Sequence, residues 1–316
     1  PNTPHKDVPS GNSEENNIII SEWGDFNKSG HLLPHWELAE KYNIIDFQQG
    51  AKITGSGFPI YQGKGAKLQR GLINFFLDYN ISAGYTEYSP PFFVNENSAF
   101  NTGQIPDKEG MMYHMVNDNL YAIPTAEVPI TNMFNNKRLK PEELPIKCTA
   151  YSPCFRREAG SYGKEVRGLN RLHQFDKVEI VQICKPSESY QILDQMVQHI
   201  GELLKKLELK FRIIKLCGGD LGFTSALTYD FEVYAPAQKK WLEVSSVSNF
   251  ETFQSNRLKL KFINEKNQNI LCHTLNGSSL ALPRIIAALL EQNQKKEKII
   301  LPNILSQYLG FYEITI

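Results

Sequence analysis

The sequence predicts an α+β fold in which a mostly antiparallel β-sheet is flanked by helices. Strand-like segments outnumber helical ones, and most follow one another without an intervening helix. This order differs from an alternating βαβ array and disfavours a Rossmann fold. Hydrophobic residues make up 41 % of the 316 residues and aromatic residues 11 %, so the chain can build a sizeable core.

Residues 1–30 are polar and rich in Pro, Asn, Glu and Gly. This composition predicts a strap or linker without a core of its own, lying across a neighbouring part of the protein. We therefore divide the chain into an N-terminal strap over residues 1–30 and one large domain over residues 31–316.

Helical periodicity appears in four places along the large domain. A short helix is expected over residues 35–42, and an amphipathic helix from Ala66 to near Gly84. A second long amphipathic helix is expected over residues 187–207, and a last helix after Gly277 that runs through residues 285–291.

Strand patterns fill most of the remaining chain. A short apolar stretch at residues 58–61 lies between glycine pairs and predicts a hairpin strand, and residues 85–88 form a strand before Pro90. Further strands are expected around residues 120–123, 146–155, 175–183, 211–216, 229–234, 241–246 and 258–262.

Charge and cysteine content narrow the class of protein. Lys plus Arg and Asp plus Glu both total 34, so the formal net charge is zero and any RNA contact must come from local patches. The 5 cysteines include no CxxC pair, which argues against a disulfide framework and a zinc knuckle. No apolar run reaches the roughly 20 residues that span a bilayer. We expect a cytoplasmic protein without a membrane partner.

The most informative segment is a strand pair around a polar loop, with one strand ending near Glu158 and the other starting near Arg171. Residues two or four apart on a strand share a face, so Arg156 lies with Glu158, and Phe175 with Glu179. Arginines suit phosphates and an aromatic ring suits a base, so this face predicts a nucleotide site. From periodicity alone, a surface hairpin with salt bridges is as good an explanation as a nucleotide site.

Three segments in order resemble the motifs of class II aminoacyl-tRNA synthetases. Phe155-Arg156-Arg157-Glu158, the loop, and residues 171–175 resemble motif 2. Residues 84–91 resemble motif 1, and Asn276-Gly277-Ser278-Ser279-Leu280 through Arg284 and Glu291 resembles motif 3. Three motifs in the right order are far more specific than any one of them.

Within this class the chain resembles the seryl-tRNA synthetases. Thr125-Ala126-Glu127 is similar to their serine loop, and Glu243-Val244-Ser245-Ser246 to their metal and ATP segment. His273-Thr274-Leu275-Asn276-Gly277-Ser278 is similar to their active-site strand. The resemblance covers essentially the whole chain.

The resemblance implies a site for ATP and Mg²⁺, with Arg156 and Arg284 as the catalytic residues. Arg156 would hold the α-phosphate, Glu158 the adenine amino group and Phe175 the adenine ring. Arg171 and Arg284 would neutralise the β- and γ-phosphates. The implied ATP-binding residues are Arg156, Arg157, Glu158, Arg171, Phe175, Glu243, Val244, Ser245, Ser246 and Arg284, and the implied metal ligands are Glu243 and Ser246.

The resemblance also implies a serine site. The amino group of serine would meet Thr125, Glu127 and Asn276, its hydroxyl would meet Glu179 and Ser278, and its carboxylate would meet Arg156. The implied serine-binding residues are Thr125, Ala126, Glu127, Arg156, Glu179, Asn276 and Ser278.

Several of these residues have a simpler interpretation. Ser246 is three residues from Glu243, so a regular strand would place them on opposite faces and a bend or bulge is needed. Glu127 could merely cap a helix that begins near Thr125. Arg284 could be a solvated helix residue, and His173 is better explained as a structural histidine than as a catalyst.

The implied activity is the joining of L-serine to ATP as seryl-adenylate, followed by transfer to tRNA(Ser), by a homodimer formed through motif 1. No heptad run precedes Trp36, where the family has a coiled-coil arm that grips tRNA, so contact with tRNA is expected to rest on Arg157, Lys164 and Arg167 near the motif 2 loop. Two alternatives remain: an armless paralogue that loads another carrier, and a silent synthetase-like binding module.

Overall fold

The main sheet of the computed structural model has 8 strands in the order β1-β11-β12-β13-β16-β10-β9-β4. The structure describes residues 1–26, 30–158 and 166–316. Neighbouring strands are antiparallel except for β4 and β9, so the predicted mostly antiparallel sheet is confirmed. The strands are β1 (Ile18–Trp23), β4 (Thr86–Glu87), β9 (Ile146–Phe155), β10 (Gln174–Cys184), β11 (Phe211–Lys215), β12 (Leu227–Ala235), β13 (Lys240–Asn249) and β16 (His273–Ala281).

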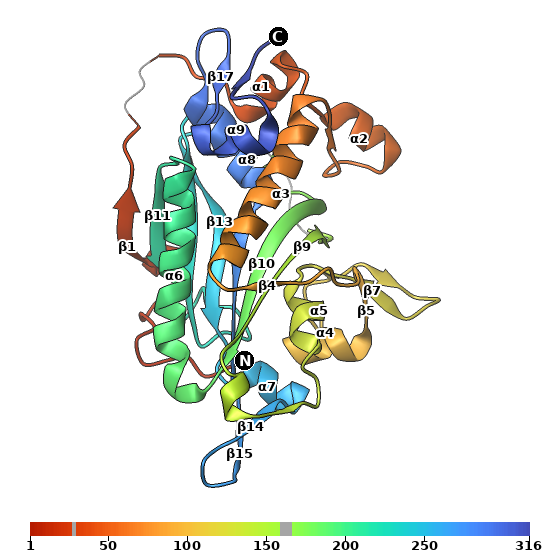
Figure 1. Cartoon of the computed structure of the whole chain (residues 1–316). Coiled ribbons are helices and arrows are strands. Elements are labelled where there is room, and N and C mark those ends of the chain that lie inside the picture. Colours follow the sequence, from red (N-terminus) through yellow and green to blue (C-terminus); the bar gives the residue numbers. More distant parts are fainter. Residues whose placement is uncertain (27–29, 159–165) are drawn as a thin grey trace.

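Three long helices pack on one face of this sheet. They are α3 (Lys64–Ser82), α6 (Ser189–Lys206) and α8 (Leu282–Asn293). Figure 1 shows α3 and α6 running across the front of the strands. Strand β10 explains how the two faces differ: Val178 and Ile180 are buried in the core with these helices, whereas Lys177 and Glu179 alternate to the opposite face.

Short elements surround the second face and the ends of the sheet. In Figure 1 α4, α5, β5 and β7 form a group beside the main sheet. The short helices are α1 (His35–Lys41), α2 (Phe47–Ile53), α4 (Glu96–Thr102), α5 (Glu127–Asn132), α7 (Phe253–Leu258) and α9 (Ser306–Leu309). The short strands are β2 (Ile45–Asp46), β3 (Ile60–Tyr61), β5 (Phe93–Asn95), β6 (His114–Met115), β7 (Leu120–Ala122), β8 (Arg138–Leu139), β14 (Lys261–Ile263), β15 (Asn269–Leu271), β17 (Ile299–Ile300) and β18 (Glu313–Ile314).

The expected long helices and most expected strands are present, but two boundaries were wrong. The last helix begins at Leu282, because residues 277–281 extend β16, which lies between β13 and β10 in the sheet. The strand expected over residues 258–262 begins only at Lys261, because Leu258 ends α7 and Lys259 has a left-handed φ of 54° that turns the chain.

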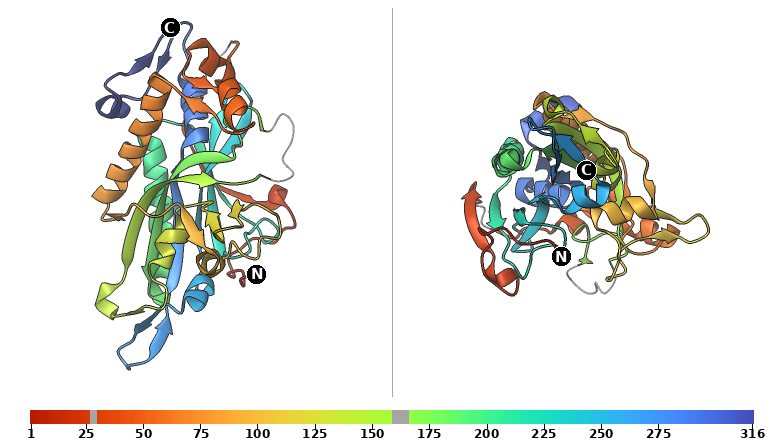
Figure 2. Two further views of the ribbon diagram at one scale, coloured as in Figure 1. Left: turned by 90° about the vertical axis from the view of Figure 1, so that its right-hand side faces the viewer. Right: turned by 90° about the horizontal axis from the view of Figure 1, so that it is seen from below.

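The first 30 residues contribute to the main sheet through β1. This strand pairs with β11 at the sheet edge, from Ile18 opposite Lys215 to Trp23 opposite Phe211. The right-hand view in Figure 2 shows the red N-terminal strand beside this edge of the sheet. Nearer the N-terminus, the side-chain amide of Asn2 donates to the carbonyl oxygens of Thr224 at 3.0 Å and Phe250 at 2.8 Å. Among the described helices, none is both long and apolar enough to cross a membrane.

Candidate active site

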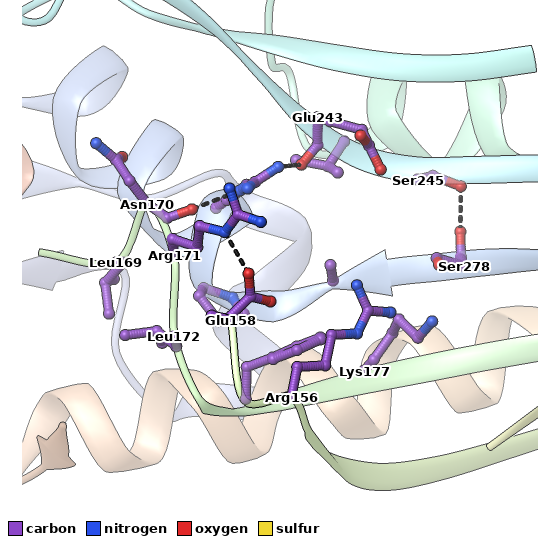
Figure 3. Close-up of a pocket in the computed structure, with 15 residues that line it drawn as sticks. Arg156, Glu158, Leu169, Asn170, Arg171, Leu172, Lys177, Glu243, Ser245 and Ser278 are labelled. Atoms are coloured by element: carbon purple, nitrogen blue, oxygen red, sulfur yellow. Dashed lines mark hydrogen bonds and ion pairs between the residues drawn. The ribbon is translucent and has the colours of Figure 1, made fainter. Parts of the chain in front are cut away.

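Two adjoining cavities lie where β9, β10, β13 and β16 meet. The smaller one, of about 300 Å³, contains Arg156, Arg171 and Arg284 and is called the arginine cavity (Figure 3). The larger one, of about 530 Å³, contains Glu127 and Glu179 and is called the carboxylate cavity. Four residues line both cavities and form their junction, namely Arg156, Lys177, Glu243 and Ser278.

Arg284 is fixed at the start of α8 by two backbone carbonyls. Its Nε donates to the carbonyl oxygen of Asn170 at 2.8 Å and its Nη1 to that of Glu243 at 2.9 Å. Burial lowers the pKa of Arg284; the charge of Glu243 opposes this effect, and the charges of Arg156 and Arg171 add to it. The guanidinium is therefore held inside the cavity, and the interpretation as a solvated helix residue was wrong.

The other two arginines contact an aromatic ring and a carboxylate. The guanidinium carbon of Arg156 lies 5.1 Å from the ring centroid of Phe175. Arg171 forms an ion pair with Glu158, which has a left-handed φ of 50°. Figure 3 shows Arg171 and Glu158 side by side, with Arg156 and Lys177 farther along the cavity.

The expected strand geometry of this hairpin was wrong in one respect. Strand β9 ends at Phe155 and β10 begins at Gln174, so Arg156, Glu158 and Arg171 all lie beyond the paired strands. They nevertheless line the same cavity as Phe175. The backbone N–H of Arg156 donates to the His173 carbonyl at 2.8 Å, which keeps the two chain segments together beyond the strands.

The carboxylate cavity is organised around the Thr125 hydroxyl. This oxygen accepts a hydrogen bond from the backbone N–H of Glu127 at 3.2 Å and donates to Glu179 Oε2 at 3.1 Å. The same Glu179 oxygen lies 2.8 Å from Lys177 Nζ. The Thr125 hydroxyl thus binds the backbone of Glu127 and the carboxylate of Glu179.

Both carboxyl groups are buried, and burial is the main cause that raises their pKa values. The pKa of Glu127 is raised to about 7 by burial and then by the charge of Glu179. The pKa of Glu179 is also raised by burial, against the opposing effect of Lys177. A cationic group entering this cavity would favour the ionised form of both.

The capping interpretation of Glu127 was wrong. Helix α5 begins at Glu127, but the side-chain oxygen that receives an N–H at its start belongs to Thr125. The Glu127 carboxylate instead lines the carboxylate cavity and accepts a hydrogen bond from Gln254 Nε2 at 2.6 Å.

Most other residues named from the sequence also reach the cavities. Val244, Ser245 and Ser278 line the arginine cavity, and Ser245 Oγ donates to the Ser278 carbonyl at 2.6 Å. Thr125, Ser246 and Asn276 line the carboxylate cavity. Neither Ala126, which is fully buried in a core cluster, nor the exposed Arg157 is among the described lining residues.

Two further sequence interpretations concern the surroundings of the site. His173 Nδ1 lies 3.0 Å from the Tyr113 hydroxyl, and its ring stacks on Phe58 at 5.4 Å, which fits a structural histidine. Near the motif 2 loop, Lys164 lies outside the described residues, and Arg167 is exposed with its guanidinium 4.8 Å from the Trp36 ring.

The bulge required between Glu243 and Ser246 is present in β13. Pairing with β12 joins Phe231 to Ser245 but Glu232 to Glu243, so Val244 is an extra residue on β13. The inserted residue reverses the alternation of side chains. Glu243 and Ser246 therefore both line the carboxylate cavity.

The surroundings of this bulge fit a magnesium ion. Glu243 and Ser246 supply hard oxygen donors, and Asp230, opposite Ser246, has a buried Oδ1 without a hydrogen-bond partner among the described residues. Among the described residues, no group of three or more His, Cys, Asp or Glu side chains is placed so that it could hold a metal ion by itself. Mg²⁺ is commonly bound by one or two carboxylates together with substrate phosphates, and a junction beside the arginine cavity suits that mode.

Lys177 is a site residue that the sequence analysis missed. It is 7 % exposed and lines both cavities. The strand pattern contained the signal, because Lys177 lies two residues from Phe175 and two from Glu179 and so shares their face of β10.

Comparisons with known proteins agree with this geometry. Residues 113–293 match the family described as tRNA synthetase class II core domain (G, H, P, S and T). The chain is 52 % identical over 321 residues to the serine–tRNA ligase of Salinibacter ruber, covering 99 % of this chain and 74 % of that protein. It is 46 % identical over 313 residues to the serine–tRNA ligase of Clostridium perfringens, covering 98 % of this chain and 74 % of that protein.

Solved structures give the same result. The seryl-tRNA synthetase of Pyrococcus horikoshii complexed with ATP superposes with a TM-score of 0.96 at 34 % identity, covering 100 % of this chain and 76 % of that one. The cytoplasmic serine–tRNA ligase of Naegleria fowleri in complex with AMP gives a TM-score of 0.95 at 27 % identity, covering 99 % of this chain and 76 % of that one. The chain belongs to the seryl-tRNA synthetase family of class II aminoacyl-tRNA synthetases.

Proposed function

We propose that the chain activates L-serine with ATP to give seryl-adenylate and pyrophosphate, and then transfers serine to tRNA(Ser). The observation that carries this proposal is the junction of the two cavities. Arg156 and Lys177 line both, so a group bound in one cavity can be presented to a group bound in the other. Relatives in this family that were solved with ATP or AMP support a nucleotide in this site.

ATP fits the arginine cavity. Phe175 offers a stacking surface for the adenine ring, and the Glu158 carboxylate can accept a hydrogen bond from its amino group. Arg171 and Arg284 are placed to neutralise the terminal phosphates.

Serine fits the carboxylate cavity. Its ammonium group would lie against Glu127 and Asn276, and its hydroxyl against Glu179 and Ser278. Its carboxylate would then point to the junction, where the cationic groups of Arg156 and Lys177 are available. A site that pairs the hydroxyl can reject alanine by roughly 10⁴ to 10⁵, because its buried polar groups would otherwise be left unpaired.

The residues act by positioning and by charge. Arg156 would orient the serine carboxylate for in-line attack on the α-phosphorus and stabilise the charge that develops there. Arg171 and Arg284 would hold the departing pyrophosphate. Mg²⁺, which Glu243 and Ser246 would hold, supplies further charge stabilisation when bound.

The acceptor is inferred from the relatives, which are named serine–tRNA ligases and are 46 % to 52 % identical to this chain. We therefore prefer tRNA(Ser) to another carrier. The complete set of lining residues also makes a silent binding module a poor explanation. A cytoplasmic location stays a prediction from the cysteine content and the lack of a membrane-spanning run.

The test is ATP–pyrophosphate exchange with each amino acid in turn, followed by charging of tRNA(Ser). We expect exchange that depends on both serine and Mg²⁺, and charging with serine. Exchange stimulated by another amino acid and not by serine would refute the assignment of the carboxylate cavity.

We also predict a C2 homodimer formed around α3 and β4, the elements that resemble motif 1. Strand β4 ends the order of the main sheet, and Thr86 and Glu87 are exposed there, as expected of an edge that a second subunit could cover. Sedimentation at micromolar concentration should give about twice the 36.0 kDa chain mass. A fully active species sedimenting as a monomer would contradict this prediction.

A further inference from the structure

A buried glutamine behind the carboxylate cavity connects three elements. Gln254 lies on α7 and is 1 % exposed. Its Nε2 donates to Glu127 Oε1 on α5 at 2.6 Å and to the Thr102 carbonyl on α4 at 3.4 Å. Its Oε1 accepts a hydrogen bond from Thr274 Oγ1 on β16 at 2.7 Å. The amide thus uses both of its N–H groups and its oxygen.

The partners of the Gln254 amide determine which end of it meets Glu127. The Thr274 side chain is fully buried, and its hydroxyl donates to the Gln254 oxygen. If the amide turned over, its oxygen would face the Glu127 carboxylate and two acceptors would oppose each other. The Thr102 carbonyl and the ionised Glu127 carboxylate can only accept, so they hold the amide N–H groups on their side, and the Thr274 hydroxyl supplies the donor that the buried amide oxygen needs.

We propose that Gln254 and Thr274 are positioning residues for serine recognition, which hold the Glu127 carboxylate in the orientation that receives the ammonium group of the amino acid. This inference rests on the proposed function, because it assumes that the carboxylate cavity takes serine. Neither residue touches the substrate; each acts through Glu127.

The surroundings of Glu127 explain why it needs this support. The charged groups that face it are Glu179 and Lys177, both on β10. Burial and the Glu179 charge raise the pKa of Glu127, whereas the hydrogen bond from Gln254, then Lys177, and then Asn276 lower it. Without the Gln254 bond, Glu127 would be both less well oriented and more easily protonated.

The test compares kinetic constants for serine and for ATP in the exchange assay. Gln254→Leu should raise KM for serine by about 10- to 100-fold, the range expected when one hydrogen bond to a charged group is lost. KM for ATP should stay within about twofold of wild type. The acidic limb of kcat/KM for serine should move to higher pH, which a merely structural defect would not produce.

Two further variants keep the inference testable if Gln254→Leu fails to fold. Thr274→Val leaves the buried oxygen of the Gln254 amide without a donor and so loosens the amide, which should raise KM for serine, while Thr274→Ser retains the hydroxyl and should restore most of the affinity. Gln292→Leu is the matched control. Gln292 is also buried and binds backbone through its amide, accepting from the Lys210 N–H at 3.0 Å and donating to the Tyr234 carbonyl at 2.7 Å, but it is not among the described lining residues.

The outcomes separate two possible errors. A wild-type chain without serine-dependent exchange would overturn the proposed function. If the wild type is active but Gln254→Leu and Thr274→Val keep its KM for serine and its pH profile, the present inference is overturned and the proposed function is not. Equal increases of KM for serine and for ATP would also overturn it, because they would indicate a general structural defect.

Discussion

The two cavities differ in how they keep their charge. The arginine cavity relies on Arg156, Arg171 and Arg284. Guanidinium groups stay protonated in proteins even when burial lowers their pKa, so this cavity presents fixed positive charge. The carboxylate cavity relies on Glu127 and Glu179. Burial raises the pKa values of these two groups and so favours their uncharged forms.

The hydrogen bonds reflect this difference. In the arginine cavity Arg284 is held by two backbone carbonyls, which fix its direction without neutralising it. In the carboxylate cavity each buried acid receives a side-chain donor, from Gln254 to Glu127 and from Thr125 to Glu179. Recognition of the amino acid therefore depends on a hydrogen-bond network, and recognition of the nucleotide depends mainly on placed cations.

The largest effect is expected where the cavities join. Arg156→Ala should lower kcat/KM for exchange by about 10³-fold, or ~4 kcal/mol, because one cation is lost from both the phosphate and the carboxylate. Arg138→Ala is the matched control, since Arg138 is an exposed arginine on β8 outside both cavities and should keep activation near wild type. If both variants lost the same activity, the junction would not depend on Arg156.

A substitution in the carboxylate cavity alone should separate the two substrates. Glu179→Ala should cost serine activation about 2 to 4 kcal/mol and leave ATP binding largely intact, because its contacts are to the amino acid. Steady-state KM values for both substrates measure the split, with the exposed Glu202→Ala on α6 as control. An equal loss of ATP binding would place Glu179 outside the serine pocket.

The converse substitution lies in the arginine cavity. Phe175→Ala should raise KM for ATP about tenfold, because stacking of a base on an aromatic ring contributes roughly 1 to 3 kcal/mol. KM for serine should change little, because Phe175 lines only the arginine cavity among the described residues. A larger effect on serine than on ATP would argue against the adenine plate.

The predictable part of this site followed from strand alternation and from the order of the motifs. Strand alternation placed Phe175 and Glu179 on one face of β10, and the motif order brought Arg284 to the same site. The spacing of Glu243 and Ser246 even required the bulge that β13 contains. Lys177 satisfied the same alternation but was overlooked, because a lysine on a strand normally indicates a solvent-exposed face.

Other features depend on contacts that spacing does not reveal. Gln254 meets Glu127 across 127 positions of sequence, and the packing of both α5 and α7 against α4 brings them together. Helices α2, α4, α5 and α7 have 6 or 7 residues, too few for a hydrophobic period to repeat. Strand β1 is exposed along its length, so no alternation of buried and exposed residues marked it.

The smallest expected effect is a pH dependence confined to the carboxylate cavity. Burial, and then the charge of Glu179, raise the pKa of Glu127 to about 7. The serine ammonium binds the ionised carboxylate, so this affinity is present above that pKa and is lost as the pH falls through it. With a pKa near 7, the ionised fraction falls from about three quarters at pH 7.5 to about one quarter at pH 6.5.

KM for serine should therefore rise about threefold between pH 7.5 and 6.5, because only the ionised fraction of Glu127 binds serine well. KM for ATP should stay constant over this window, because arginines keep their charge throughout it. Glu127→Gln should bind serine weakly but with a flat profile, since the titrating group is gone. A wild-type KM for serine that does not change between these pH values would mean that Glu127 is already ionised below pH 6.5, and that its hydrogen-bond donors outweigh its burial.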